Sequence, residues 1–147
     1  MLWKQTEPSE VADELHEIHR SFQVIRESLE DQADRAPYEL VRSRLRELEG
    51  VVDRGLEELS GRLADLGRHP PSIGRNEAVV GRNCWERLAR LQDGYRDVIR
   101  RLKRLAVRWE EEHPEDAALA AAVRDGALRS RSVVGDLLAR SDPHALD

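Results

Sequence analysis

Apolar residues recur along the chain at helical spacing, in four stretches separated by breaks. In the first stretch they lie three or four residues apart: Val11, Leu15, Ile18, Phe22, Ile25 and Leu29. This period puts them on one face of an α-helix. A helix is therefore predicted over about residues 9–32. Its first turn lies near Pro8 and Ser9, and Pro37 keeps the preceding residue out of a helical conformation.

The second stretch predicts a helix over about residues 37–66. Its apolar seam has one stutter, at Val52, and consists of Val41, Leu45, Leu48, Val52, Leu56, Leu59, Leu63 and Leu66. Gly67 is expected to end this helix.

Three glycines, Gly50, Gly55 and Gly61, lie inside the same helix. Each is expected to lower the stability of the helix by about 1 kcal/mol relative to alanine. Either a close helix approach, within the bundle or between subunits, explains them, or they reflect compositional drift.

The third stretch has the most regular seam, formed by Cys84, Leu88, Leu91, Tyr95, Val98, Leu102, Leu105 and Trp109. Asn83 and Glu86 resemble a capping box, but Asn76 is an alternative N-cap, and the helix is predicted over about residues 77–112. Pro114 then opens a fourth helix over about residues 114–140. Its seam has small residues in the middle and consists of Leu119, Val123, Gly126, Ser130, Val133 and Leu137.

No segment alternates with a period of two, so the fold class predicted is all-α, a four-helix bundle formed by residues 1–147 as a single domain. Short turns make the first and second helices antiparallel, and likewise the third and fourth. The connection from Gly67 to Asn83 is longer and could reach roughly 50 Å when extended. That length suffices to cross the bundle and set the second and third helices parallel, provided little of the connection is helical.

Composition limits the partners and the compartment. Charged residues make up 36% of the chain, and 24 basic against 29 acidic residues leave a net charge of −5. This balance argues against nucleic-acid binding by bulk charge. Cys84 is the sole cysteine, which favours a reducing compartment. The first ten residues lack a secretory apolar run, and Ala117–Val123 is too short for a membrane span, so a cytoplasmic protein without membrane contact is expected.

Three segments carry a resemblance to a known family. The second helix opens with Pro37-Tyr38-Glu39-Leu40 and closes with EELSGRLADLGRHPPS; the third reads LARLQDGYRDVIRRLKRLAVRWEEE and the fourth PEDAALAAAVRDGALRSRSVVGDLLA. Nearly the whole chain is similar to the Dps-like, bacterial miniferritin branch of the ferritin-like superfamily. The resemblance implies a ferritin-like bundle, a homo-oligomer and a role in stress or iron homeostasis.

The resemblance also implies where a ferroxidase centre would lie. In the family, two histidines of one subunit and an aspartate and a glutamate of its partner bind Fe(II), a ligand set that suits iron. Aligned through Tyr38 and Gly67, these positions carry other residues here: Leu29 or Glu30, Arg42, Glu57 and Gly61. Glu57 is the one ligand that survives. The ferroxidase centre is therefore predicted to be lost, with no catalytic residue assigned.

A displaced metal site is the alternative. His16 and His19 lie three residues apart, with Asp13, Glu14 and Glu17 beside them, so they share a helix face and offer enough ligands for a metal. Because Leu15 and Ile18 occupy the seam, His16 is expected to point outward and His19 to the flank, as solvated or interface side chains. The metal candidates are thus Glu57, His16 and His19, and iron is the candidate cofactor.

A basic stripe follows the third helix. It consists of Arg96, Arg100, Arg104 and Arg108, with Arg101 and Lys103 alongside. It could contact phosphates or an acidic partner. The favoured interpretation is a solvated face or a ladder of ion pairs with neighbouring acidic residues such as Glu27, Glu30, Asp31 and Asp34. Because the N-terminal tail carries only Lys4, DNA binding is expected to be weak or absent.

Three functions stay open at this level. The first is a Dps-like homo-oligomer without its own ferroxidase centre. The second is an active iron-binding ferroxidase that uses displaced ligands in the first helix. The third is a helical protein-interaction module without a metal, since unrelated bundles share the same packing physics.

Overall fold

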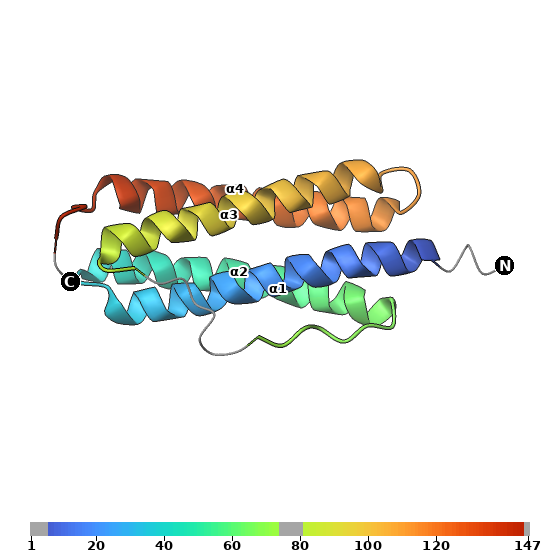
Figure 1. The fold of residues 1–147 in the computed structure, drawn as a ribbon, viewed down its shortest axis with the longest axis horizontal. Coiled ribbons are helices and arrows are strands. Elements are labelled where there is room, and N and C mark those ends of the chain that lie inside the picture. The colour runs from blue at the N-terminus through green and yellow to red at the C-terminus, as the bar shows by residue number, and fades with distance from the viewer. Residues whose placement is uncertain (1–5, 74–80, 146–147) are drawn as a thin grey trace.

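The computed structural model describes residues 6–73 and 81–145 (Figure 1). These residues form four α-helices and no strand: α1 (Thr6–Arg35), α2 (Glu39–Asp65), α3 (Cys84–Arg108) and α4 (Pro114–Ala139). The predicted all-α four-helix bundle is confirmed. None of the described helices combines the length and the apolar character that a membrane span requires.

The helices pack as two antiparallel pairs. The most extensive contacts join α1 to α2 and α3 to α4, and smaller contacts join α1 to α3 and α2 to α4. Figure 1 shows that α2 and α3 run in the same direction, and that the described residues after α2 turn back along the outside of the α1–α2 pair. The described parts of the connection between α2 and α3, residues 66–73 and 81–83, are not helical, and the parallel direction of the two helices is the one that the sequence allowed.

The core consists of the apolar seams. Every predicted seam residue of α1 and α3 is buried, whereas Leu56 and Leu66 of α2 are partly buried. The seam of α4 differs from the prediction, because its buried face is formed by Asp116, Ala117, Ala120, Val123, Ala127, Ser130, Val134 and Leu137. Leu119, Gly126 and Val133 lie at its edge. An alanine-rich helix is apolar on several sides, so its sequence pattern leaves the buried side ambiguous.

The end of α2 follows the predicted glycine stop. Gly67 has a φ of 76°. The Arg68 N–H donates to the Leu63 carbonyl over 2.8 Å, and the Gly67 N–H donates to Ala64 over 3.0 Å. These are the two hydrogen bonds of a Schellman motif.

The predicted limits of α3 are wrong at both ends. The helix begins at Cys84, because residues 81–83 are not helical, and residues 77–80 lie outside the described part of the chain. The Asn83 side chain accepts from the Glu86 N–H over 2.8 Å, while the Glu86 carboxylate pairs with Arg82 at 3.1 Å instead of returning to Asn83. At the other end residues 109–112 form turns, because the chain must reverse before Pro114 starts α4.

The Asn83 side chain also holds the C-terminal segment. Its Nδ2 donates to the carbonyls of Pro143 over 2.9 Å and Ala145 over 3.0 Å. One amide therefore caps α3 and anchors the chain that follows α4.

The bounds of α1, α2 and α4 lie within a few residues of those expected, and α1 extends further at both ends than predicted.

The glycines inside α2 do not make close contacts within the bundle. A Cβ added at Gly50 or Gly61 would meet nothing within 4 Å, and one at Gly55 would meet Val123 at an ordinary 3.7 Å. A close helix approach inside this chain therefore does not explain them.

Gly50→Ala and Gly61→Ala are each expected to raise the free energy of unfolding by about 1 kcal/mol, because alanine favours a helix interior and both sites are open. Urea denaturation of the two variants measures the change. Gly67→Ala is the opposing control, since its positive φ makes alanine destabilising there. If the two α2 variants instead lower stability together with molecular mass in light scattering, those glycines contact another subunit.

Candidate functional site

The positions implied for iron ligands lie on α1 and α2. Leu29 is completely buried in the core, so Glu30 is the residue of that pair that faces solvent. Glu30 pairs with Arg26, whose Nη1 lies 3.2 Å from the carboxylate. Glu57 and Gly61 are both exposed on α2. Among these positions Glu57 therefore has the one carboxylate that makes no ion pair with the described residues.

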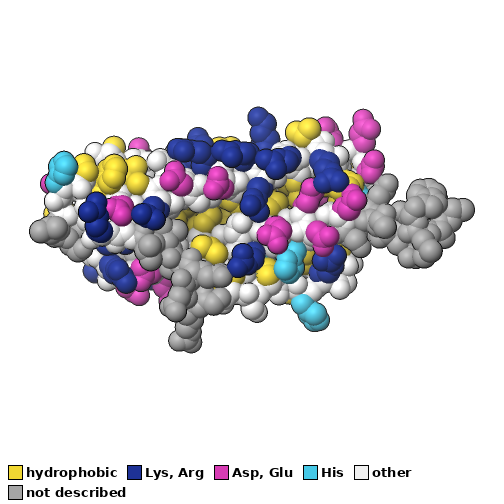
Figure 2. Space-filling model, in the orientation of Figure 1, with side chains coloured by type: hydrophobic (Ala, Val, Ile, Leu, Met, Phe, Trp, Pro, Cys, Tyr) yellow, Lys and Arg dark blue, Asp and Glu magenta, His cyan; other side chains and the backbone are white. Residues whose placement is uncertain are grey.

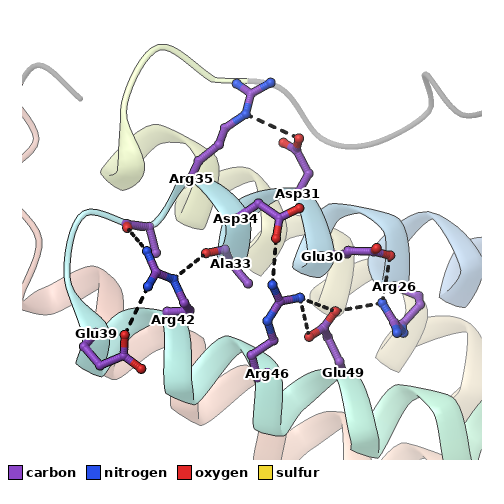
Figure 3. A network of polar contacts seen from close by, with 11 residues as sticks. Arg26, Glu30, Asp31, Ala33, Asp34, Arg35, Glu39, Arg42, Arg46 and Glu49 are labelled. Atoms are coloured by element: carbon purple, nitrogen blue, oxygen red, sulfur yellow. Dashed lines mark hydrogen bonds and ion pairs between the residues drawn. The ribbon is translucent and has the colours of Figure 1, made fainter.

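Arg42 has a structural role at its position. Its Nε donates to the carbonyl of Ala33 over 3.2 Å, its Nη2 to the carbonyl of Ala36 over 3.2 Å, and its Nη1 to the carboxylate of Glu39 over 3.1 Å (Figure 3). Ala33 lies in the last turn of α1 and Ala36 just beyond it, where carbonyls lack helical partners and a cation interacts favourably with the helix dipole. Arg42 thus caps α1 from the first turn of α2.

A network of arginines and carboxylates continues along the same α1–α2 face. Glu49 is 6% exposed and accepts from Arg26 over 2.8 Å and from Arg46 over 3.1 Å. Arg46 also donates to Asp34 over 2.6 Å, and Arg26 to Asp53 over 2.7 Å. Figure 3 shows the guanidinium groups lying between the two helices.

The carboxylates of this network are already bound by cations. Hydrogen bonds to Asp34 and then to Glu49 raise the pKa of Arg46, so it stays charged at any physiological pH. Guanidinium groups occupy the oxygen atoms that a metal would require. The network therefore fastens α1 to α2 and does not offer a ligand set.

The two histidines of α1 differ in how deeply their side chains are buried. His16 is half-buried, whereas His19 is 3% exposed, so His19 lies beside the seam as expected but is an interface side chain and not a solvated one. The His19 Nε2 makes a 2.8 Å hydrogen bond with the Ser60 hydroxyl of α2, and Nδ1 has no partner. Close packing of α1 on α2 buries the position beside the seam as well as the seam itself.

The described residues contain no group of three or more histidine, cysteine, aspartate or glutamate side chains arranged to hold a metal ion. His19 is hydrogen-bonded to Ser60 and Glu57 is exposed on the neighbouring helix. A metal site that used His16, His19 or Glu57 would therefore need further ligands from outside the described residues.

A second polar cluster, missed by the sequence analysis, lies at the opposite end of the bundle. Asp116 is completely buried. It accepts from Arg62 of α2 through two hydrogen bonds, of 2.5 Å from Nε and 3.3 Å from Nη2. Arg62 also pairs with Glu115 at 3.3 Å. Two-pronged arginine–carboxylate pairing of this kind fixes orientation as well as charge, and here it joins α2 to α4.

The same cluster reaches α1 and α3 through aromatic rings. The His113 Nδ1 lies 4.0 Å from Asp116, and the His113 ring meets the Trp109 ring edge-on with centroids 5.0 Å apart. The Trp109 indole N–H donates to Glu14 over 2.5 Å. Arg108 lies 4.6 Å above the Trp109 ring and pairs with Glu14 at 2.6 Å. Polar and ring contacts therefore connect all four helices at this end.

The basic stripe has partners other than the expected ones. Arg96 pairs with Asp93 at 3.4 Å, Arg100 with Asp97 at 4.0 Å, and Arg108 with Glu10 at 3.0 Å. Three of the acidic residues proposed as partners pair elsewhere: Glu30 with Arg26, Asp31 with Arg35 and Asp34 with Arg46. The antiparallel arrangement explains this, because the C-terminal half of α3 lies beside the N-terminal half of α1.

The remaining basic residues of the stripe are exposed. Arg101, Lys103 and Arg104 make no ion pair within residues 6–73 and 81–145. Figure 2 shows lysine and arginine side chains gathered over the α3–α4 layer of this face, with acidic side chains interspersed. The stripe is thus partly neutralised along its own helix and partly solvated.

The order, direction and pairing of the helices are those of a ferritin-like four-helix bundle. The chain is similar to a solved structure of Dps1 from Mycobacterium smegmatis, in a mutant form, with a TM-score of 0.76 and 17% sequence identity over 90% of this chain and 97% of that one. No protein-family model matches the chain, and no curated protein matches it. The likeness establishes the ferritin-like fold.

Arg62→Met is expected to lower the free energy of unfolding by about 3 kcal/mol, because it leaves the buried Asp116 carboxylate without its cation. Urea denaturation at neutral pH measures the loss. Arg44→Met is the matched control on the same helix. Its pair with Glu47, at 3.4 Å, is exposed on both sides and should contribute less than about 0.5 kcal/mol. Equal losses in the two variants would contradict the role given to the Arg62–Asp116 pair.

His19 makes the stability depend on pH. Burial, and then the charge of neighbouring His16, lower the pKa of His19 below its usual value of 6.5. The unfolded chain therefore binds a proton more readily than the folded one. The stability due to neutral His19 is present above pH 6.5 and is lost as the pH falls from there toward the lower pKa of the folded state.

The free energy of unfolding is expected to fall between about pH 7 and pH 5.5, and His19→Gln should flatten this part of the profile while keeping a polar partner for Ser60. Urea denaturation of both proteins at several pH values tests it. An unchanged slope in the variant would show that other groups cause the dependence.

Proposed function

We propose that the chain is a Dps-like subunit of a homo-oligomer that acts in stress or iron homeostasis without a ferroxidase centre of its own. The observation that carries the proposal is the position of Arg42 and the hydrogen bonds that it makes there. Its guanidinium stands where the resemblance implies a histidine ligand, and three hydrogen bonds hold it there. A fixed cation at that position opposes the approach of Fe(II) as substrate.

The neighbouring positions support the same conclusion. Glu30 pairs with Arg26, and Gly61 has no side chain to contribute. Glu57 alone retains a carboxylate where one is implied, and one ligand does not hold two metal ions. The donor set therefore does not fit the family's iron chemistry.

The second candidate, a displaced site at His16 and His19, is less well supported. The His19 Nε2 contacts Ser60, and the side chain is buried between α1 and α2. A metal at Nε2 would have to break this hydrogen bond, and Nδ1 is buried, so a metal at either nitrogen would have to open the helix pair. The proposal includes weak or no DNA binding, because the basic stripe is interrupted by acidic residues and the net charge is −5.

Iron oxidation provides the sharpest test. Purified protein given Fe(II) under air is expected to oxidise it no faster than buffer and to retain less than one iron per chain, because the ligand positions carry Arg42 and Gly61. Absorbance of Fe(III) and bound-iron analysis measure the two quantities. Stoichiometric iron and a fast rate that His16→Ala with His19→Ala abolishes would establish the displaced site instead. A fast rate that Glu57→Gln abolishes would show that the family centre is retained.

Light scattering tests the assembly part of the proposal. A shell of twelve chains would have a mass of about 202 kDa, twelve times the 16.8 kDa of one chain. A smaller closed oligomer also agrees with the proposal. A monomer at all concentrations would contradict it and favour a helical interaction module.

A further inference from the structure

A hollow of about 320 Å³ lies between the N-terminal half of α1 and the C-terminal half of α3. Ile18 of α1 and Leu105 of α3 form its apolar floor, and both belong to the core. The other residues of its lining all carry a charge: Asp13, Glu14 and Glu17 on α1, and Arg101 and Arg104 on α3. One wall of the hollow is therefore acidic and the facing wall is basic.

The two walls follow from the packing of two amphipathic helices. Asp13 and Glu17 lie four residues apart on α1, and Arg101 and Arg104 lie three residues apart on α3. The members of each pair therefore share a face of their helix. Figure 2 shows lysine and arginine side chains over α3 and acidic side chains over the N-terminal half of α1.

Two of the three carboxylates on the acidic wall have partners outside the hollow. Asp13 pairs with Arg68 at 2.8 Å, and Glu14 pairs with Arg108 at 2.6 Å. Glu17 is exposed, and its carboxylate makes no ion pair in the part of the chain that the structure describes. Glu17 is therefore the carboxylate that a cation entering the hollow can reach without displacing an arginine.

The guanidinium groups of the basic wall are likewise exposed. Neither Arg101 nor Arg104 makes an ion pair with any residue of 6–73 and 81–145, Glu17 across the hollow included. Two guanidinium groups on one helix face can bind the oxygens of one carboxylate.

The charges of the two walls select the charge of a ligand. A simple anion at the arginines is repelled by the acidic wall, and a simple cation at Glu17 is repelled by the two guanidinium groups. A ligand that carries both charges meets a complementary charge on each wall. The hollow therefore favours a zwitterion over an ion of either sign.

The distance between the walls sets the length of such a ligand. Because packed helices lie about 8–10 Å apart, a ligand that reaches both walls needs its charges at opposite ends of a chain of several carbons. We propose that the hollow binds an ω-amino carboxylic acid. Its carboxylate binds Arg101 and Arg104, its ammonium binds Glu17, and its methylene groups pack over Ile18 and Leu105. The volume agrees, because small-molecule sites begin at about 300 Å³.

Four probes separate the parts of this proposal. ε-Aminocaproate carries the two charges at the ends of its chain, hexanoate lacks the ammonium, hexylamine lacks the carboxylate, and glycine has both charges on one carbon. Calorimetry on the full chain is expected to show ε-aminocaproate binding with a Kd of about 1 mM, the range for a ligand of this size. Hexanoate and hexylamine should each bind about fivefold more weakly, the equivalent of one exposed charge pair. Glycine should bind more weakly still, because it cannot reach both walls.

A fifth probe, Nα-acetyl-lysine, distinguishes two sources of the same chemistry. It presents the ε-ammonium and the carboxylate of a C-terminal lysine, with the α-amino group blocked as it is in a peptide. Binding tighter than that of ε-aminocaproate assigns the site to the C-terminus of a peptide, and weaker binding assigns it to a free ω-amino acid. Either result supports the proposal if the probes with one charge bind more weakly than ε-aminocaproate.

Variants on each wall test the location of the site. Glu17→Gln is expected to weaken ε-aminocaproate about fivefold without weakening hexanoate, because only the ammonium contacts Glu17. Arg101→Gln combined with Arg104→Gln should weaken ε-aminocaproate at least as much without weakening hexylamine. Arg96→Gln combined with Arg100→Gln is the matched control, since both residues are exposed on α3 and neither lines the hollow. The control should leave binding of every probe unchanged.

The proposal is overturned if ε-aminocaproate does not bind at about 10 mM, ten times the expected Kd, because the charged side chains are then satisfied by water and salt alone. It is equally overturned if ε-aminocaproate, hexanoate and hexylamine bind alike, or if the control variant weakens binding as much as the variants on the two walls do. None of these outcomes depends on iron chemistry or on the oligomeric state.

Discussion

Along α3, apolar side chains about one helical turn apart are completely buried, while most of the positions between them are charged. Leu88, Leu91, Tyr95, Val98 and Leu102 have no exposed surface. Burial of side chains this size contributes about 1.5–3 kcal/mol each, far more than an exposed ion pair. The other three helices must therefore lie where they cover this narrow seam, and every polar contact in the bundle has to fit that arrangement.

The polar contacts follow from the register that the seams impose. With α1 antiparallel to α2, Arg26 meets Glu49, and Arg42 reaches the carbonyls at the end of α1. At the other end of the bundle, the packing of α2 on α4 brings Arg62 to Asp116. Arg42 thus caps a helix at the position where the resemblance implies a ligand, and under the proposed function the same guanidinium opposes a cation there. A histidine there would lose this cap.

Features set by local sequence could be predicted, and those set by contact between distant segments could not. The seams of α1 and α3 and the stop at Gly67 depend on residues within a turn or two, so their pattern was sufficient. For the start of α3 the local pattern left both Asn76 and Asn83 open, and Asn83 is the cap. The buried face of α4 was not predictable, because alanine suits either side. Arg62 and Asp116 are far apart in sequence and each resembles an ordinary surface charge. The burial of His19 and the partners of the arginine stripe depend on helix register, which periodicity does not encode.

The two faces of α2 differ in where polar side chains fix their contacts. Toward α1, Glu49 accepts hydrogen bonds from two arginines and His19 from α1 contacts Ser60. Toward α4, small residues leave an open cavity lined by Gly55 and Gly126, and Tyr95 of α3 interacts with Ser130 of α4 beside it. The polar side chains that fix this second contact lie at the C-terminal end of α2, where Arg62 binds the buried Asp116. Hydrogen bonds of charged and polar side chains therefore fix the α1–α2 contact at several points along the pair, and the α2–α4 contact at one end.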